Sequence, residues 1–171
     1  MRAIHFARAA AVVSVVAVAL TLAGTALASR CTTVTGTFDG ATYYPPPCLS
    51  PIGVCLRLTL SGSFLQTEDF MFTTLVNAGD TSDPTRYEYT GSSVISIDRD
   101  RALYGQDTGV MHISPVELAP FVTTIDITGG TRQYSYASGQ LLFAGNLNLS
   151  TGLASGTYDG TICKAGDGED E

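Results

Sequence analysis

The amino-acid sequence predicts an all-β fold, namely a closed antiparallel barrel of eight strands, with a two-sheet β-sandwich as the alternative. After the first 28 residues, no window of eleven residues shows apolar side chains at helical spacing without an interrupting glycine or proline. β-Branched and aromatic residues are abundant instead, and glycines interrupt them at short intervals. A cysteine near each end, Cys31 and Cys163, can join the first strand to the last.

The predicted strands are separated by glycine, proline and aspartate, and the longest irregular insertion between them is Asn77–Arg86. In chain order the strands are Thr32–Phe38, Val54–Leu60, Phe64–Leu75, Tyr87–Ile97, Ala102–Tyr104, Gly109–Ile113, Phe121–Thr128, Gln133–Phe143 with Gly145–Leu149 as its continuation, and Gly156–Cys163.

Alternation along three of these strands predicts which face is buried. Apolar residues occupy most odd-numbered positions of YEYTGSSVISI from Tyr87, of FVTTIDI from Phe121 and of LLFAGNLNL from Leu141. The even-numbered positions are more polar. One apolar and one semi-polar face are typical of an antiparallel sheet that packs on one side. This alternation is the same in a barrel and in a sandwich.

The N-terminus predicts a secretory signal peptide at residues 1–28. Arg2, His5 and Arg8 precede the apolar run Ala9–Gly24, and the small-residue pattern that ends at Ala28 is typical of a cleavage site. The sequence therefore predicts export by the general secretory route to a secreted or periplasmic location. An uncleaved membrane anchor is the alternative.

The charge balance limits the class of partner. Residues 29–163 are predicted to form one barrel domain, and residues 164–171 an acidic disordered tail. Without the two arginines of the leader, seven basic residues stand against 16 acidic ones, a net charge of −9. Nucleic acids and anionic membranes need a basic patch, so we expect neither a nucleic-acid partner nor a membrane partner after cleavage. The oligomeric state stays open.

The four cysteines predict two disulfides, because their number is even and the chain is predicted to be exported. Three pairings are possible. We expect Cys48–Cys55 to close a short proline-rich loop and Cys31–Cys163 to tie the first strand to the last. A zinc site is the alternative, but the chain has no C-x-x-C spacing.

The segment ITGGTRQYSYASGQL, from Ile127 to Leu141, has two interpretations. A double glycine, a threonine and a basic residue can bind phosphate when a strand precedes them and a helix follows. The following residues are β-rich and contain further glycines, so no helix is expected. The segment is therefore predicted to be a hairpin between two strands.

The residues from Ile127 to Cys163 also carry a family resemblance. They resemble the C-terminal part of the barrel shared by allene oxide cyclases and plant dirigent proteins, and more closely that of exported bacterial relatives. The chain departs from the family pattern at Arg132, where the family has glycine, and at Gln133. The matching residues are Gly129, Gly130, Thr131, Tyr134, Ala137, Gly139, Gly156, Tyr158 and Gly160.

The resemblance implies an eight-stranded antiparallel barrel with an internal cavity. Family activities include the cyclisation of a reactive fatty-acid epoxide and the steering of phenoxy-radical coupling. No catalytic residue can be carried over, because the strands that hold the acidic and arginine positions of the plant families do not align residue by residue with this chain. The family has a glycine directly after Thr131, and glycine suits a left-handed backbone. Arg132, which occupies this position here, is therefore expected to be strained.

Four residues are candidates for a ligand pocket. Asp126 lies in mid-strand between two isoleucines, and with Glu88 and Arg86 it would bind or protonate a ligand if that face points into the barrel. If the face points outward, which is the default for charged side chains, the three are solvent residues. Tyr134 is an aromatic candidate, with the barrel core as its alternative place.

The other titratable groups predict no metal site, no cofactor and no catalytic constellation. Glu68 and Asp69 are expected to be solvated at a strand start. Asp98–Asp100 and Asp107 lack the glycine and terminal glutamate of a calcium loop, which favours a solvated turn. His112 has no histidine partner after residue 28, and a structural or exposed role is expected.

Three functions therefore compete. The first is an exported, disulfide-stabilised barrel that binds a small hydrophobic molecule without transforming it. The second is an enzyme of cyclase or dirigent type that steers a reactive hydrophobic intermediate. The third is a structural or surface-interaction protein with a filled barrel, because eight-stranded barrels are packed solid or hold one small ligand. No group of residues combines chemistry with specific spacing, so a non-enzymatic role ranks first.

Thiol titration tests the disulfide prediction. Denatured, unreduced protein without its leader is expected to release no free thiol, because all four cysteines are paired. Reduction before titration is the control and should release four thiols per chain. Two or more free thiols before reduction would contradict the pairing.

Overall fold

The computed structural model describes residues 30–79, 81–114 and 117–165. The predicted signal peptide and the tail from residue 166 lie outside the described residues. No helix in the described part of the chain is long and apolar enough to cross a membrane. The elements in order are β1 (Arg30–Tyr43), β2 (Cys55–Ser61), β3 (Thr67–Asn77), β4 (Arg86–Ser96), β5 (Ala102–His112), β6 (Leu118–Gly130), the short 3₁₀ helix η1 (Arg132–Tyr134), β7 (Ser138–Asn148) and β8 (Leu153–Lys164).

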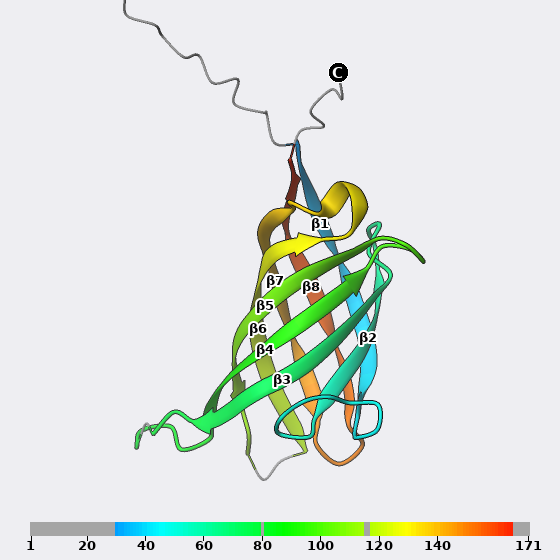
Figure 1. The fold of residues 1–171 in the computed structure, drawn as a ribbon. Coiled ribbons are helices and arrows are strands. Elements are labelled where there is room, and N and C mark those ends of the chain that lie inside the picture. The colour runs from blue at the N-terminus through cyan, green and yellow to red at the C-terminus, as the bar shows by residue number, and fades with distance from the viewer. Residues whose placement is uncertain (1–29, 80, 115–116, 166–171) are drawn as a thin grey trace, which may run out of the picture.

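The eight strands form a closed antiparallel barrel, which confirms the predicted fold class and excludes the sandwich. Each strand pairs with its neighbours in the sequence, and β8 returns to pair with β1 from Arg30↔Lys164 to Ala41↔Leu153. Figure 1 shows the tilted strands, with the start of β1 and the end of β8 side by side at one end. We call this the terminal end. The opposite end, which carries the β1–β2 and β7–β8 connections, is the mouth end.

Both predicted disulfides are present. Cys31 and Cys163 occupy directly paired positions of β1 and β8, with their Cα atoms 3.9 Å apart, so the bond reinforces the closing pair of strands. Cys48 and Cys55 close the β1–β2 connection at the mouth end. No described cysteine is free.

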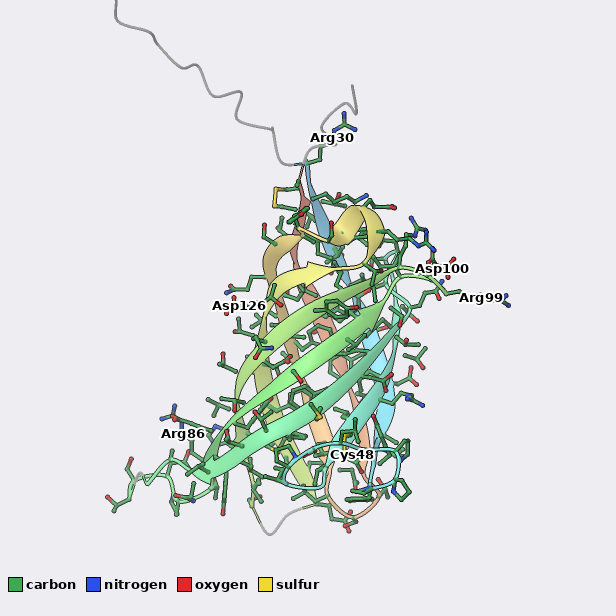
Figure 2. All side chains as sticks on the ribbon, in the orientation of Figure 1. Arg30, Cys48, Arg86, Arg99, Asp100 and Asp126 are labelled. Carbon is green, nitrogen blue, oxygen red and sulfur yellow. A yellow bond between two sulfur atoms is a disulfide. The ribbon has the colours of Figure 1, made fainter. Side chains whose placement is uncertain are left out.

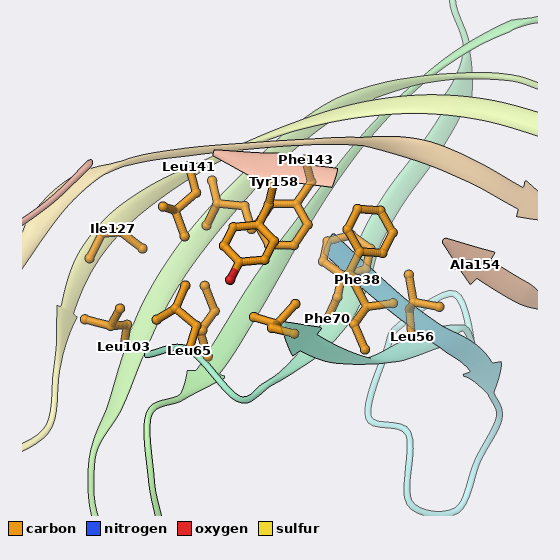
Figure 3. Packing of buried hydrophobic residues seen from close by; sticks show 14 of the residues in the cluster. Phe38, Leu56, Leu65, Phe70, Leu103, Ile127, Leu141, Phe143, Ala154 and Tyr158 are labelled. Carbon is orange, nitrogen blue, oxygen red and sulfur yellow. The ribbon is translucent and has the colours of Figure 1, made fainter. Parts of the chain in front are cut away.

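Side chains from all eight strands fill the barrel interior (Figure 3). The predicted alternation is confirmed, since the odd-numbered positions of β6 from Phe121 to Ile127 are buried inside. Phe38 fits because glycines face it from β7 and β8. A Cβ added at Gly145 or Gly156 would lie 2.8 or 2.6 Å from Phe38 Cζ, closer than side-chain atoms pack.

Two predicted strand boundaries were wrong. The segments Ala102–Tyr104 and Gly109–Ile113 belong to one strand, β5, which pairs with β4 without interruption. The glycine that suggested a break, Gly105, marks a register shift against β6. The strand predicted from Gln133 begins at Ser138 instead, because η1 and its flanking residues form the connection.

This connection confirms the hairpin interpretation of the Ile127–Leu141 segment, since β6 and β7 are antiparallel neighbours. Thr131 anchors it to the β4–β5 connection. Its hydroxyl accepts a hydrogen bond from the Ala102 N–H at 2.9 Å and donates one to the Asp100 carbonyl at 3.0 Å. Arg132 follows with φ at 54°, and no other described non-glycine residue has a positive φ. The arginine thus occupies a left-handed position that glycine adopts without cost.

Substitution of Arg132 tests this strain. Arg132→Gly is expected to leave the free energy of unfolding unchanged or to raise it by up to about 1 kcal/mol, because relief of the left-handed strain offsets the added freedom of the unfolded chain. Its ion pair with Asp100, 3.7 Å long and well exposed, contributes little. Chemical denaturation measures the change.

Arg99→Gly is the matched control, because Arg99 lies in the neighbouring β4–β5 connection without a positive φ. That variant should lose about 0.5–1 kcal/mol. A clear loss in Arg132→Gly equal to that of the control would show that no strain is relieved.

Candidate functional site

Three of the four predicted pocket residues lie on the outer face of the barrel. Figure 2 shows Asp126 and Arg86 projecting outward from the strands. Asp126 Oδ1 accepts a hydrogen bond from Gln140 Nε2 at 2.9 Å. Arg86 and Glu88 are neighbours on β4 and form an exposed ion pair of 2.9 Å. The structure therefore pairs Arg86 with Glu88 but places Asp126 apart from them, and it gives none of the three access to the interior.

Tyr134 is buried, but at the terminal end, where η1 packs over the core. The Lys164 ammonium lies 4.6 Å from the centre of its ring, a cation–π contact. His112 lies at the other end, with Nδ1 3.1 Å from Asp83 Oδ2 on the protein surface. These two residues belong to different ends of the barrel and do not form one site.

Two acidic side chains that were predicted to be solvated, Glu68 and Asp107, lie inside the barrel. Glu68 on β3, Ser93 on β4 and Asp107 on β5 are all buried on three adjacent strands. Ser93 Oγ lies 2.8 Å from Glu68 Oε1 and 2.9 Å from Asp107 Oδ1. The prediction of solvated turns was wrong for Glu68 and Asp107, because both side chains point inward.

The geometry of this acid pair requires a proton. A serine hydroxyl has one hydrogen, so it donates to only one of two carboxyl oxygens at a time. The second short contact is satisfied when the other carboxyl is protonated and donates to Ser93 Oγ. Glu68 Oε2 and Asp107 Oδ2 are buried without a protein partner, which further disfavours the ionised forms.

Burial shifts both acids towards the neutral form. Loss of hydration raises the pKa of Glu68 to about 8, although the hydrogen bond with Ser93 lowers it and the charge of Asp107 raises it. The same loss of hydration raises the pKa of Asp107 to about 7, again opposed by Ser93. At neutral pH the pair therefore keeps at least one proton inside an apolar barrel.

Position along the strand could have identified this pair. Glu68 shares its face of β3 with the buried Phe70 and Phe72, two and four residues on. Asp107 likewise shares its face of β5 with Leu103 and Met111. In the part of the chain that the structure describes, no three histidine, cysteine or carboxylate side chains gather as metal ligands.

The interior leaves little open space. A cavity of about 20 Å³ lies beside Glu68, Tyr89 and Thr123 and is otherwise lined by apolar side chains. This volume is about that of one water molecule. Tyr89 and Thr123 hydrogen-bond to each other through their hydroxyl groups. The barrel is thus almost filled at this level.

A larger pocket of about 190 Å³ opens at the mouth end. Its walls are mainly apolar, and it shares Phe72, Met111 and Leu147 with the inner cavity. We call it the mouth pocket. Its lining residues are Thr42, Tyr44, Ile52, Val54, Phe72, Leu75, Met111, Ile113, Leu147, Asn148, Leu149 and Gly152.

Two connections hold the walls of the mouth pocket in place. In the disulfide-closed β1–β2 connection, Ser50 Oγ donates a hydrogen bond of 2.6 Å to the Phe72 carbonyl. In the β7–β8 connection, the Gly152 carbonyl accepts a hydrogen bond of 2.8 Å from the Thr42 N–H. The β1–β2 connection is therefore fixed to the middle of β3, and the β7–β8 connection to the end of β1.

Comparison with known proteins identifies no family. No family model matches the chain, and no curated protein matches it. A solved structure, that of a pterocarpan synthase dirigent protein, is similar to it at 12% sequence identity and a TM-score of 0.33. The similarity covers 80% of this chain and 92% of that one. The barrel assignment accordingly rests on the strand pairing of the chain itself, and the closer resemblance to exported bacterial proteins stays an expectation.

The acid pair predicts a pH-dependent stability. Below the ordinary pKa values of both acids, 4.5 for Glu68 and 3.8 for Asp107, both are protonated in the folded and the unfolded chain. Above pH 5 the unfolded chain has lost most of these protons, whereas the folded barrel holds them until the pH approaches the raised pKa values of about 7 and 8, so the free energy of unfolding falls as pH rises from 5 to 8. The melting temperature is expected to fall by on the order of 10 °C over this range.

Glu68→Gln and Asp107→Asn should each flatten this dependence, because each removes one buried acid. The control Asp126→Asn, on the outer face, should keep the slope of the parent protein. Thermal unfolding followed by circular dichroism at several pH values measures it. An unchanged slope in both interior variants would mean that the pair does not hold the proton.

Proposed function

We propose that this protein is an exported barrel that binds a small apolar molecule in the mouth pocket. The observation that carries the proposal is the pocket itself, an apolar recess of about 190 Å³ at the end of an otherwise filled barrel. Two disulfides and the predicted signal peptide support export.

The volumes limit the size of the ligand. An apolar protein cavity of about 150 Å³ binds benzene, so the mouth pocket suits one aromatic ring or the end of an acyl chain. The inner cavity, about 20 Å³, admits nothing of that size. The ligand therefore lies against Phe72, Met111 and Leu147 at the mouth, above the core.

A second candidate function is control of a reactive apolar intermediate, as in cyclases and dirigent proteins. The observation that favours it is the acid pair, because Glu68 borders the inner cavity whose wall continues into the mouth pocket. A neutral carboxyl in that position is a proton donor to a bound intermediate whose basic atom reaches past Phe72, Met111 and Leu147 into the inner cavity. The apolar binding site is common to both functions.

Binding of a neutral fluorophore tests the proposal. N-Phenyl-1-naphthylamine is expected to gain fluorescence on binding, with its single phenyl ring inside the mouth pocket and its naphthyl group at the opening. Leu149→Trp should weaken this binding at least about tenfold, because the larger side chain occupies the pocket that Leu149 lines. Fluorescence titration gives the dissociation constants.

Leu142→Trp is the matched control. Leu142 is 41% exposed on the outer face of β7, close to the 43% of Leu149, and it does not line the mouth pocket. Its affinity for the fluorophore should equal that of the parent protein. Absence of binding, or equal loss in both variants, would favour the structural role with a filled barrel.

A further inference from the structure

The mouth end carries apolar side chains that face solvent. Leu49 is 86% exposed, Tyr44 62% and Leu153 57%. With Ile52 and Leu149, which are also exposed, they form what we call the mouth rim. Single exposed leucines are ordinary on protein surfaces, but a group of them around a pocket is typical of an interaction site.

The mouth rim has no charged side chain. The segments 44–54 and 149–153, which contain all five rim residues, have no lysine, arginine, histidine, aspartate or glutamate, although the chain has 25 lysine, arginine and acidic residues. Figure 2 shows Arg30, Arg99 and Asp100 at the terminal end, opposite the loop that contains Cys48. Arg86 belongs to the β3–β4 side, which projects sideways in Figure 1. The charged residue next to the rim is Glu117 of the β5–β6 connection, whose backbone carbonyl accepts a hydrogen bond of 2.8 Å from the Leu149 N–H.

The rim is held in its exposed conformation. Leu49 lies within the β1–β2 loop that the Cys48–Cys55 disulfide closes. Within it, Ser50 Oγ accepts a hydrogen bond from the Ile52 N–H at 3.2 Å, and the Ser50 carbonyl accepts one from the Gly53 N–H at 3.0 Å. Leu49 therefore stays in solvent, and its burial against a partner costs little conformational entropy.

We propose that the mouth rim inserts into the surface of an electrically neutral, zwitterionic lipid layer, with the mouth pocket facing the lipid. Leucine side chains gain from transfer out of water, and tyrosine favours the boundary between lipid and water. Without residues 1–28 the chain has a net charge of −9 and is repelled by anionic lipid, whereas an uncharged rim matches a zwitterionic surface.

This inference goes beyond ligand binding, and it is tested at the two rim residues outside the pocket, because Tyr44, Ile52 and Leu149 also line the mouth pocket. Leu49 and Leu153 do not line the mouth pocket. It also revises the expectation of no membrane partner, because a missing basic patch bears only on anionic surfaces. In combination with the proposed function, it implies that the apolar ligand enters the pocket directly from lipid.

Flotation with vesicles of phosphatidylcholine tests the inference, using the protein without residues 1–28. The parent protein is expected to float with the vesicles. Leu49→Glu and Leu153→Glu should each lower the partition coefficient at least about tenfold, because each removes an apolar contact and places a charge in lipid. Tyr136→Glu, at a residue that is 82% exposed in the β6–β7 connection of the terminal end, is the control and should partition like the parent.

Each other outcome contradicts the inference. These outcomes are no flotation of the parent protein, equal loss in Tyr136→Glu, or flotation only with vesicles that contain phosphatidylglycerol. Self-association that Leu49→Glu abolishes in analytical ultracentrifugation, without flotation of the parent, would assign the rim to a second copy of the chain. Fluorophore binding separates the two proposals, because Leu49→Glu should retain it whether or not the rim binds lipid.

Discussion

Pairing of β1 with β8 is the constraint on which the rest of the structure depends. This pairing closes an open eight-stranded sheet into a barrel with a single interior, and it leaves no exposed edge strand. The Cys31–Cys163 bond lies in this pair of strands. Once the barrel is closed, the two-residue alternation of each strand decides whether a side chain is buried or solvated, and no strand can slip by one residue without exposing its core face.

Closure also decides what is available for function. The inside of an eight-stranded barrel is narrow, and here aromatic rings opposite glycines, such as Phe38 opposite Gly156, fill most of it. Polar features that remain compatible with this packing include the hydroxyl pair of Tyr89 and Thr123, and the Glu68–Asp107 pair with its shared serine. The inner cavity is limited to about 20 Å³, whereas the mouth pocket and its uncharged rim lie at the hairpins, where the ladder ends.

Much of this fold could be predicted from the sequence, because its determinants are local. Alternation and punctuating glycines predict the strands, and an even number of cysteines in a chain that is predicted to be exported predicts the disulfides. The site was harder to predict. A carboxylate is solvated by default, so the sequence predicted that Glu68 and Asp107 lie in solvated turns. Asp126 was a pocket candidate because it lies in mid-strand, but its side chain faces solvent. A buried carboxylate is distinguished from a solvated one by whether it lies an even number of positions from buried apolar residues of the same strand. The mouth pocket was not predicted because connections, which have no regular periodicity, form part of its walls.

The most direct test of the account is nuclear magnetic resonance of methyl-labelled protein saturated with N-phenyl-1-naphthylamine. The account predicts intermolecular nuclear Overhauser effects from the aromatic protons of the probe to methyl groups of Ile52, Met111 and Leu149. It predicts none to Leu103, Ile125 and Leu141, whose side chains are completely buried in the filled core. Contacts to these core methyl groups, or no contact at the mouth, would contradict it.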